Sequence, residues 1–456
     1  MTDTDKLATQ TLERAQIFSP ELHFKSLSIS LSLYLIATWC SMAGMEIFGW
    51  LTFALSMSYA FRTRLGASKV SATHSGQRLS LGEMVSEVLP WKLMIFWYVV
   101  VILGVFFPGT PADEKLHIFG SHRWMLLLIA NSFALSLCPP KLKAYRVFLA
   151  FTGIVAVYAI FQSFTGIDLL RMHDANPHRA VQFLDVRKDI QLWRSAGLFG
   201  SPMGYVYIAG IHSCLALAVA LVFPSEHSRL RRWSLFVFVL IAASLVTTYV
   251  RGGWFSIAVA VLVMTWLANR KFFLWAIGMG AGAFTVLFVS LVQFRERFMS
   301  LLDPKYASNS ERMGLWKMNL RIFLDHPIFG IGWEMNEVRA CEYVNCQAIP
   351  KPFTGHAHNN YLQALSGLGI TGFTAYLAFI GFFLWATYRL WKRLPENLYW
   401  ARALTLAALG AQIHLHLGGL TECNWKAGAT NHNIMIALAI VTSLIYLEKK
   451  GALRSL

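Results

Sequence analysis

Residues 203–223 read MGYVYIAGIHSCLALAVALVF, residues 224–232 read PSEHSRLRR, and residues 233–250 read WSLFVFVLIAASLVTTYV. Two long apolar runs are thus separated by a short segment that holds three arginines. Runs of about 17 to 25 apolar residues match a bilayer core of roughly 30 Å, because a helix rises 1.5 Å per residue. The stretch predicts two membrane-crossing helices joined by a basic turn.

This pattern recurs along the whole chain. Hydrophobic residues make up 56% of its 456 residues and charged residues only 14%, which is too little charge to cover a globular protein of this length. We therefore expect an all-α polytopic membrane protein with about twelve transmembrane helices. The apolar runs that predict them are residues 26–42, 44–61, 90–107, 123–138, 146–164, 203–223, 233–250, 253–268, 272–293, 359–388, 401–420 and 432–447.

Basic residues indicate how the spans are oriented, because short loops rich in lysine and arginine stay on the cytoplasmic side. Every even-numbered span is followed by such a cluster. The clusters are Arg62, Arg64, Lys69 and Arg78; Lys141, Lys143 and Arg146; Arg229, Arg231 and Arg232; Arg270 and Lys271; Arg389, Lys392 and Arg393; and Lys449, Lys450 and Arg454. We expect both termini in the cytoplasm and the loops after odd-numbered spans on the outer side.

This topology divides the chain into four segments. Residues 1–25 form a cytoplasmic tail, and residues 26–293 hold the first nine spans, with an outer loop at 165–202. Residues 294–358 form a long outer loop with an amphipathic helix, between spans nine and ten. Residues 359–456 hold the last three spans and a short cytoplasmic tail.

Both long outer loops are basic, against the usual distribution of charge. An anionic ligand would account for this, since arginine and lysine bind phosphate oxygens through charge-assisted hydrogen bonds; loops neutralised by their own aspartates are the alternative. Arg194 precedes the turn SAGLFGSPMG, which includes Gly200 and whose amides favour an anion at a helix N-terminus. Arg251 lies in TTYVRGGW, where a charge near the membrane is costly unless it snorkels or lines a wet cavity.

The second outer loop contains the segment SNSERMGLWKMNLRIFLDHPIFGIGW, which predicts a helix lying over the membrane as a lid. Ser308 and Glu311 have the spacing of a capping box, and Pro327 ends the helix just past His326. We expect Arg312 and Arg321 on or near its polar face. The residues expected on its apolar face are Leu315, Trp316, Leu320, Phe323 and Leu324.

The loop ends in HAHNNYLQ, residues 356–363, at the start of the tenth span. A helix N-terminus favours neutral imidazole, which can accept a proton as a general base must. Two alternatives remain. One is a metal site, which is disfavoured because histidines two apart on a helix diverge. The other is a structural histidine that caps the tenth span, although Asn359 and Asn360 are natural caps that can take this role instead.

Other polar side chains allow more than one interpretation. His414 and His416 lie within the eleventh span, where hydrogen bonds between helices are their common role. Glu422 follows that span and is a candidate to orient a base or to anchor an arginine. Cys341 and Cys346 lie in the outer loop, where they either form a disulfide or stay free.

The order of these segments resembles the O-antigen ligase and polymerase superfamily of bacterial inner-membrane proteins. The resemblance rests on Arg…GLFGSPM, TTYVRGGW, ERMGLWKMNLRIFLDHPIFGIGW and HAHNNYLQALSGLGITG, which together cover about residues 190–390. The most specific elements are an HPxxGxGW segment that begins at His326 and the HNxYLQ segment that begins at His358.

The resemblance implies that a glycan is moved from undecaprenyl pyrophosphate to an acceptor hydroxyl, with inversion and without a metal or other cofactor. In a ligase the acceptor is lipid A–core. The site would face the periplasm from the bacterial inner membrane, and the partners would be the lipid-linked donor, lipid A–core and membrane lipids, with no nucleic acid. An O-antigen polymerase, a protein O-oligosaccharyltransferase and a non-enzymatic transporter of lipid-linked glycan are the alternatives.

The resemblance also assigns roles to residues. The histidine followed by asparagine is His358, the expected general base, and the two arginines expected to bind the pyrophosphate are Arg194 and Arg251. We further expect a set of residues around them to bind substrate. These residues are Gly200, Arg312, Arg321, His356, Asn359 and Tyr361.

Overall fold

The computed structural model describes most of the chain. The described segments are residues 20–40, 42–64, 79–106, 120, 122–170, 182–183, 193–345 and 355–453. Most of the predicted outer loop at 165–202 and most of the N-terminal tail lie outside them, as do Lys69, Arg78 and Arg454. Regular structure in the described part is helical, apart from one short antiparallel pair of β1 (Gln182–Phe183) and β2 (Trp193–Arg194).

Twelve helices coincide with the apolar runs that predict the twelve spans. They are α2 (Pro20–Cys40), α3 (Met42–Arg64), α5 (Trp91–Val105), α7 (Trp124–Leu137), α8 (Leu142–Thr165), α9 (Pro202–Val222), α10 (Ser228–Val246), α11 (Arg251–Ala268), α12 (Arg270–Ser290), α17 (Asn360–Arg393), α18 (Tyr399–Gly418) and α19 (Gly428–Lys449).

Six of these helices are long and apolar enough to cross a membrane on their own: α8, α9, α11, α12, α17 and α19. The short helix α4 (Leu81–Glu87) and α5 pass the same test only as a pair, bent by 83°. The described residues therefore indicate an all-α membrane protein with several spans, and the count of twelve stays a prediction.

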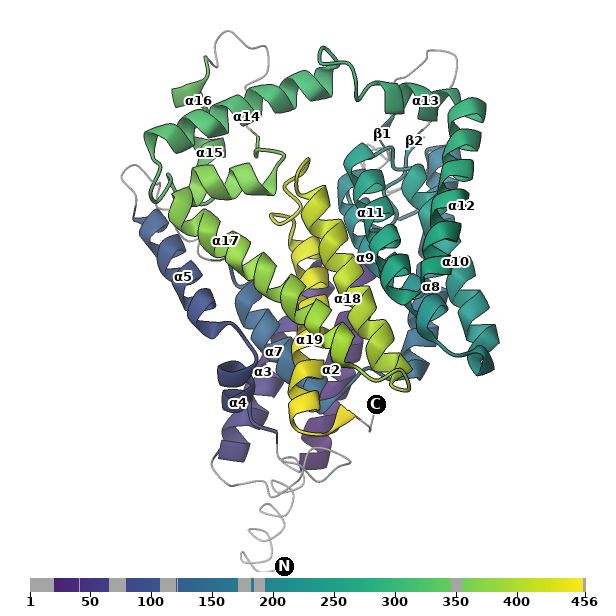
Figure 1. The fold of residues 1–456 in the computed structure, drawn as a ribbon. Helices are drawn as coiled ribbons and strands as arrows, with labels where there is room; N and C mark the ends of the chain where they lie inside the picture. The colour runs from purple at the N-terminus through teal and green to yellow at the C-terminus, as the bar shows by residue number, and fades with distance from the viewer. Residues whose placement is uncertain are drawn as a thin grey trace, which may run out of the picture.

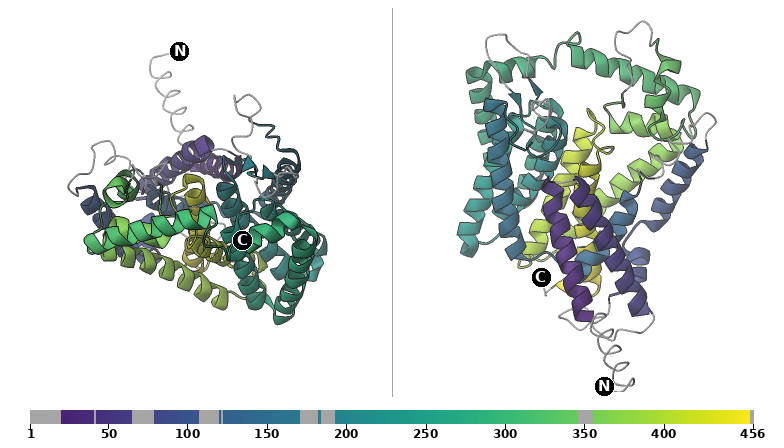
Figure 2. Two further views of the ribbon diagram at one scale, coloured as in Figure 1. Left: turned by 90° about the horizontal axis from the view of Figure 1, so that it is seen from above. Right: turned by 180° about the vertical axis from the view of Figure 1, so that it is seen from behind.

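The helices α9, α18 and α19, most of whose residues are buried, form the centre of the bundle. α18 packs against α9 and α11, α19 packs against α7, and α2 lies beside α3 on the back of the molecule (Figure 2). At the rim, α12 has no buried residue. α2 begins and α19 ends at the same end of the bundle, so the connection from α18 to α19 lies at the opposite end (Figure 1).

The connection between α12 and α17 lies at this opposite end too. It contains α13 (Val292–Met299), α14 (Ala307–Asp325), α15 (Met335–Val338) and α16 (Ala340–Tyr343). α14 ends before Pro327 as predicted, but the predicted capping box of Ser308 and Glu311 is wrong. The helix begins at Ala307 without a side-chain cap, and Ser308 Oγ accepts a hydrogen bond of 3.3 Å from Arg251 instead.

The buried face of α14 also differs from the predicted apolar face. Leu315 is buried, but Leu320 and Leu324 are 47% and 65% exposed. Met318 and Ile322 are buried with Leu315, and their spacing places all three on one side of the helix. The reason is that α14 packs against α17. This contact, and not the side of α14 that is richest in apolar residues, determines which side of the helix is buried.

α14 is followed by a segment that pairs with a broken turn of α17. We call residues 327–332 together with residues 366–371 the glycine seam. Its four backbone hydrogen bonds, of 2.8 to 3.2 Å, run from the N–H groups of Ile331, Gly332, Ile370 and Thr371 to the carbonyl groups of Ser366, Gly367, Pro327 and Ile328, respectively.

Two glycines with positive φ make this approach possible. Gly330 has φ 67° and Gly369 has φ 63°, a region that other residues rarely adopt. A Cβ on Gly330 would overlap the backbone of Gly367, and one on Gly369 would overlap the backbone of Ile328. Gly369 interrupts the helical geometry of α17, so a short first piece that begins at Asn360 is set at an angle to the rest.

The described cysteines include both bonded and free ones. Cys341 is disulfide-bonded, and Cys346, its proposed partner, lies outside the described residues. Cys138, Cys214 and Cys423 are free.

Candidate active site

The two histidines of HAHNNYLQ lie in a tight turn directly before α17. His358 has φ 45°, and its backbone N–H donates a hydrogen bond of 3.2 Å to His356 Nδ1. The ring centroids are 4.2 Å apart. The expectation that the two rings diverge is therefore wrong, because the pair precedes the helix instead of lying on it. Since His356 Nδ1 accepts a hydrogen bond, the proton of the neutral ring is on Nε2.

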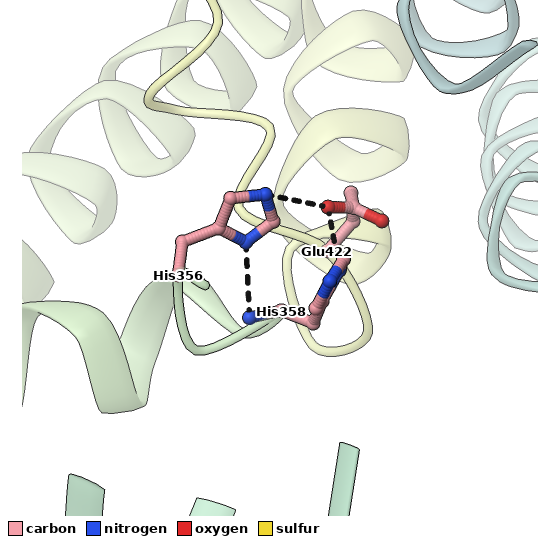
Figure 3. Close-up of side chains that lie close together, drawn as sticks. All are labelled: His356, His358 and Glu422. Atoms are coloured by element: carbon pink, nitrogen blue, oxygen red, sulfur yellow. Dashed lines mark hydrogen bonds and ion pairs between the residues drawn. The ribbon is translucent and has the colours of Figure 1, made fainter. Parts of the chain in front are cut away.

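Glu422 meets both histidines from the connection between α18 and α19 (Figure 3). His358 Nδ1 lies 2.9 Å from Glu422 Oε1, and His356 Nε2 lies 3.7 Å from the same oxygen. The carboxylate is 8% exposed. Burial raises the pKa of Glu422. The hydrogen bond from His358 and the neighbouring positive charges lower it by more, so the net pKa is below the ordinary value.

An ionised Glu422 fixes the tautomer of His358. The carboxylate can only accept, so Nδ1 of His358 carries the proton and Nε2 is left as an acceptor. The His358 side chain is 26% exposed, so a substrate can reach the ring. A carboxylate that orients an imidazole in this way is a recurring arrangement in general-base catalysis.

Arg251 begins α11 and is held by polar groups of the loop over it. It is 7% exposed and donates to Ser300 Oγ at 2.6 Å and to Asn309 Oδ1 at 2.8 Å. Its guanidinium and that of Arg297 each lie 5.5 Å from the ring centre of Tyr306. The hydrogen bonds and the shared ring hold two cations around the same tyrosine.

Arg194 approaches the same region from β2. Its Nε donates to the carbonyl of Thr248 at 3.0 Å. The pKa of Arg194 is lowered to about 10, mainly by burial and also by the charges of Arg297 and Arg312, while Glu422 acts in the opposite direction. The charges of Arg297 and Arg312 also act on Arg251. We call these four arginines the arginine cluster.

The arginine cluster adjoins the histidines through Glu422. Arg312 lies 3.7 Å from Glu422 Oε2, an oxygen without a hydrogen bond from any described residue. One carboxylate cannot neutralise four guanidinium groups, so the site has a surplus of positive charge. Such a surplus beside an oriented imidazole suits a reaction in which an anion develops near a hydroxyl that loses its proton.

The three groups around Glu422 also have the spacing of a metal site. Ligand atoms of His356, His358 and Glu422 all lie within 4.8 Å of one another, and two histidines with a glutamate are a known zinc set. The carboxylate is, however, already shared with the guanidinium of Arg312, and like charges oppose a cation here. The surroundings therefore favour an anion over a metal ion.

Two of the residues expected to bind substrate, Asn359 and Tyr361, make hydrogen bonds to the backbone. Asn359 caps α17 by accepting hydrogen bonds of 2.9 and 3.0 Å from the N–H groups of Tyr361 and Leu362, and its Nδ2 donates to the carbonyl of Leu420. Tyr361 donates to the carbonyl of His416. Both side chains tie the first turn of α17 to the end of α18, and so bring Glu422 beside the histidines.

The other residues expected to bind substrate differ in their position relative to Glu422. Arg312 is in the arginine cluster, whereas Arg321 is exposed on α14, nine residues farther along, or about 13 Å. Gly200 is exposed in the turn before α9, with no atom within 4 Å of its Cβ position. The contacts of Glu422 with His356, His358 and Arg312 include neither Arg321 nor Gly200, although Met203, three residues after Gly200, contacts Arg194.

A buried network of amides supports the histidine turn, and no sequence motif indicates it. Asn336 bonds to Asn319 at 2.7 Å and exchanges bonds of 3.0 and 2.7 Å with Gln363. Ser366 donates to Asn319 at 2.6 Å. Gln363 Oε1 also accepts the N–H of Ala357 at 3.0 Å. The network joins α14, α15 and α17 to the residue between the two histidines.

Comparison with known families gives one match, over part of the chain. The family described as O-Antigen ligase matches residues 236–377, a span that includes Arg251, Arg312 and His358. No curated protein matches the chain. The family match confirms the resemblance to the O-antigen ligase superfamily and indicates a membrane glycosyltransferase of ligase or polymerase type. Arg194 and Glu422 lie outside the matched residues.

Proposed function

We propose that the chain is an O-antigen ligase: an inverting, metal-independent glycosyltransferase that moves a glycan from undecaprenyl pyrophosphate to a hydroxyl of lipid A–core. The observation that carries the proposal is the oriented pair of His358 and Glu422 beside the arginine cluster. We place the reaction at the periplasmic face of the inner membrane, because the loops that hold these residues follow odd-numbered predicted spans.

The arginine cluster binds the diphosphate of the donor in this proposal. Guanidinium groups form paired, charge-assisted hydrogen bonds with phosphate oxygens. As the bond between the sugar and the diphosphate breaks, negative charge grows on the leaving group, and fixed cations stabilise it without reorganising. Arg251 and Arg194 contribute most, because both are largely buried and are fixed by the groups that surround them.

The histidine pair activates the acceptor. Nε2 of His358 takes the proton of the acceptor hydroxyl, whose oxygen attacks the anomeric carbon as undecaprenyl pyrophosphate leaves with the bonding electrons. Attack from the side opposite the leaving group inverts the anomeric centre. Glu422 stabilises the imidazolium that forms, and the tautomer of His358 supports this assignment.

The experiment that tests the proposal uses purified protein in detergent with undecaprenyl pyrophosphate-linked glycan. Three acceptors are offered separately: rough lipopolysaccharide, a second lipid-linked glycan and a pilin-like protein. A ligase extends the rough lipopolysaccharide, with or without EDTA. Extension of the second lipid-linked glycan instead identifies a polymerase, and extension of the pilin identifies a protein O-oligosaccharyltransferase. A transporter yields no product with any acceptor, and loss of product in EDTA overturns the metal-independent mechanism.

A further inference from the structure

A cavity of about 1070 Å³ runs along the side of the bundle between α8 and α10. It shares no lining residue with the candidate active site. Its walls are largely apolar, with Leu149, Ile154 and Phe161 on α8 and Trp233 and Phe236 on α10. Ile154, Trp233 and Phe236 are more than half exposed, so the cavity is a groove on the surface of the bundle.

One end of the groove is basic. Arg146 near the start of α8 and Arg229 at the start of α10 both line it, together with His227 and Glu226. Both arginines are exposed, and neither makes a hydrogen bond or ion pair with another described residue. Glu226 is the sole acidic lining residue, so this end has a surplus of positive charge.

We propose that the groove binds one anionic phospholipid, with its phosphate between Arg146 and Arg229 and its acyl chains along α8 and α10. Basic pockets between membrane helices bind anionic lipid head groups in this way. The exposed Trp233 near the basic end fits the preference of tryptophan for the membrane–water interface.

The length of the groove favours this occupant over a longer chain. Along α8 it extends from Arg146 to Phe161, which is about 22 Å of helix. One leaflet of a bilayer contributes roughly 15 Å of hydrocarbon, so acyl chains anchored at the basic end fill most of the groove. A polyprenyl lipid whose diphosphate lies at the arginine cluster would enter from the other end, where the lining residues carry no cation.

Native mass spectrometry tests the proposal directly. The full-length protein is reconstituted in bilayers of equal parts phosphatidylglycerol and phosphatidylcholine, extracted in mild detergent, and the retained lipids are identified. We expect phosphatidylglycerol to be retained over phosphatidylcholine. The double variant Arg146→Gln/Arg229→Gln should retain about tenfold less, since each basic residue near a membrane surface adds appreciably to the attraction for anionic lipid.

Two further variants separate a lost site from a damaged fold. Ile154→Trp fills the groove from an exposed position and should also release the phospholipid, whereas Phe164→Trp, exposed on the same helix but outside the groove, should not. Lys271→Gln, at an exposed basic position on α12, is the matched charge control. Equal retention of both phospholipids, wild-type retention by the double variant, or a polyprenyl phosphate lipid in place of phosphatidylglycerol would overturn the proposal. The measurement reports lipid retention only, so its outcome is independent of the proposed glycosyl transfer.

Discussion

His358 combines a strained backbone with a directed side chain. A non-glycine residue in the left-handed region costs of order 1 to 3 kcal/mol, and His358 has φ 45°. The turn is held by the hydrogen bonds of the His358 ring to Glu422 and of its N–H to His356. Strain retained at one residue, with partners on both sides, is typical of a position whose orientation matters for chemistry.

The first prediction concerns the general base. We expect His358→Ala to lower the rate of transfer by about 10² to 10⁴-fold, the usual contribution of general-base catalysis. Glu422→Gln should cause a smaller loss, because an amide oxygen still accepts from Nδ1 but does not stabilise the imidazolium. Initial rates with lipid-linked glycan and rough lipopolysaccharide measure both effects, and His23→Ala on α2 is the control. Full activity of His358→Ala refutes the assignment.

The second prediction concerns the arginine cluster. Arg251→Ala should reduce transfer by about 10²–10³-fold through loss of electrostatic stabilisation, and Arg194→Ala should behave similarly. Arg251→Lys should recover only part of the rate, because an ammonium cannot make the paired hydrogen bonds of the planar guanidinium. Arg321→Ala provides the comparison: its exposed position on α14 predicts a rate near wild type, and a hundredfold loss there would contradict the geometry.

The third prediction concerns pH and stability. Burial, with the charge of His358, lowers the pKa of His356 below its ordinary value of 6.5. The unfolded chain then binds this proton more readily than the folded protein, so stability falls as the pH drops below about 6.5. The lowered pKa of Glu422 acts the same way, but only as the pH falls through its ordinary value of 4.5 and below.

Between pH 7.5 and 5.5 the effect of His356 dominates that of Glu422. We therefore expect Tm in detergent to fall less steeply over this range in His356→Asn than in the wild type, since the Asn amide oxygen still accepts the N–H of His358 but does not titrate. His23→Asn should keep the wild-type slope. Parallel Tm curves for the wild type and His356→Asn would show that His356 does not contribute.

Among the elements, α14 and α17 show where sequence patterns suffice and where they do not. The apolar run over 359–388 correctly predicts a helix there, and Pro327 correctly predicts the end of α14. The capping box fails because Arg251 uses Ser308 Oγ, a contact 57 residues apart in the chain. The same hydroxyl can serve a local cap or a tertiary contact, and here the tertiary contact prevails because it satisfies a donor of the buried Arg251.

The glycine seam supplies the fourth prediction. Gly330→Ala and Gly369→Ala should each destabilise the protein by about 2 to 5 kcal/mol, from the positive φ together with overlap against the facing backbone. Gly381→Ala in α17 is the matched control: it has no atom within 4 Å of its Cβ position, and it should stabilise by up to about 1 kcal/mol. Tm in detergent measures all three. Similar values for the three variants would mean that the seam adapts to a side chain.

The whole molecule assembles its site from distant parts of the chain. The site takes Arg194 from β2, Arg251 from α11, Arg312 from α14, His358 from the turn before α17 and Glu422 from the connection after α18. Sequence motifs point to four of these residues, because each lies within a recognisable segment. Glu422 lies in the segment TECNWKAG, which matches no motif. Its place after the eleventh span makes it a candidate to orient a base or to anchor an arginine, but only the packing of α17 against α18 identifies His358 as its partner.

The glycine seam has a consequence for anyone who engineers this protein. The most recognisable sequence motifs surround Gly330 and Gly369, where two backbone segments are in direct contact. A side chain at either glycine would overlap the facing backbone. The connection after α18 matches no sequence motif, yet it holds Glu422, whose carboxylate accepts from His358 Nδ1. Libraries that target the candidate site should therefore leave both glycines untouched and also keep the residues that follow Glu422, since Cys423 and Asn424 are buried.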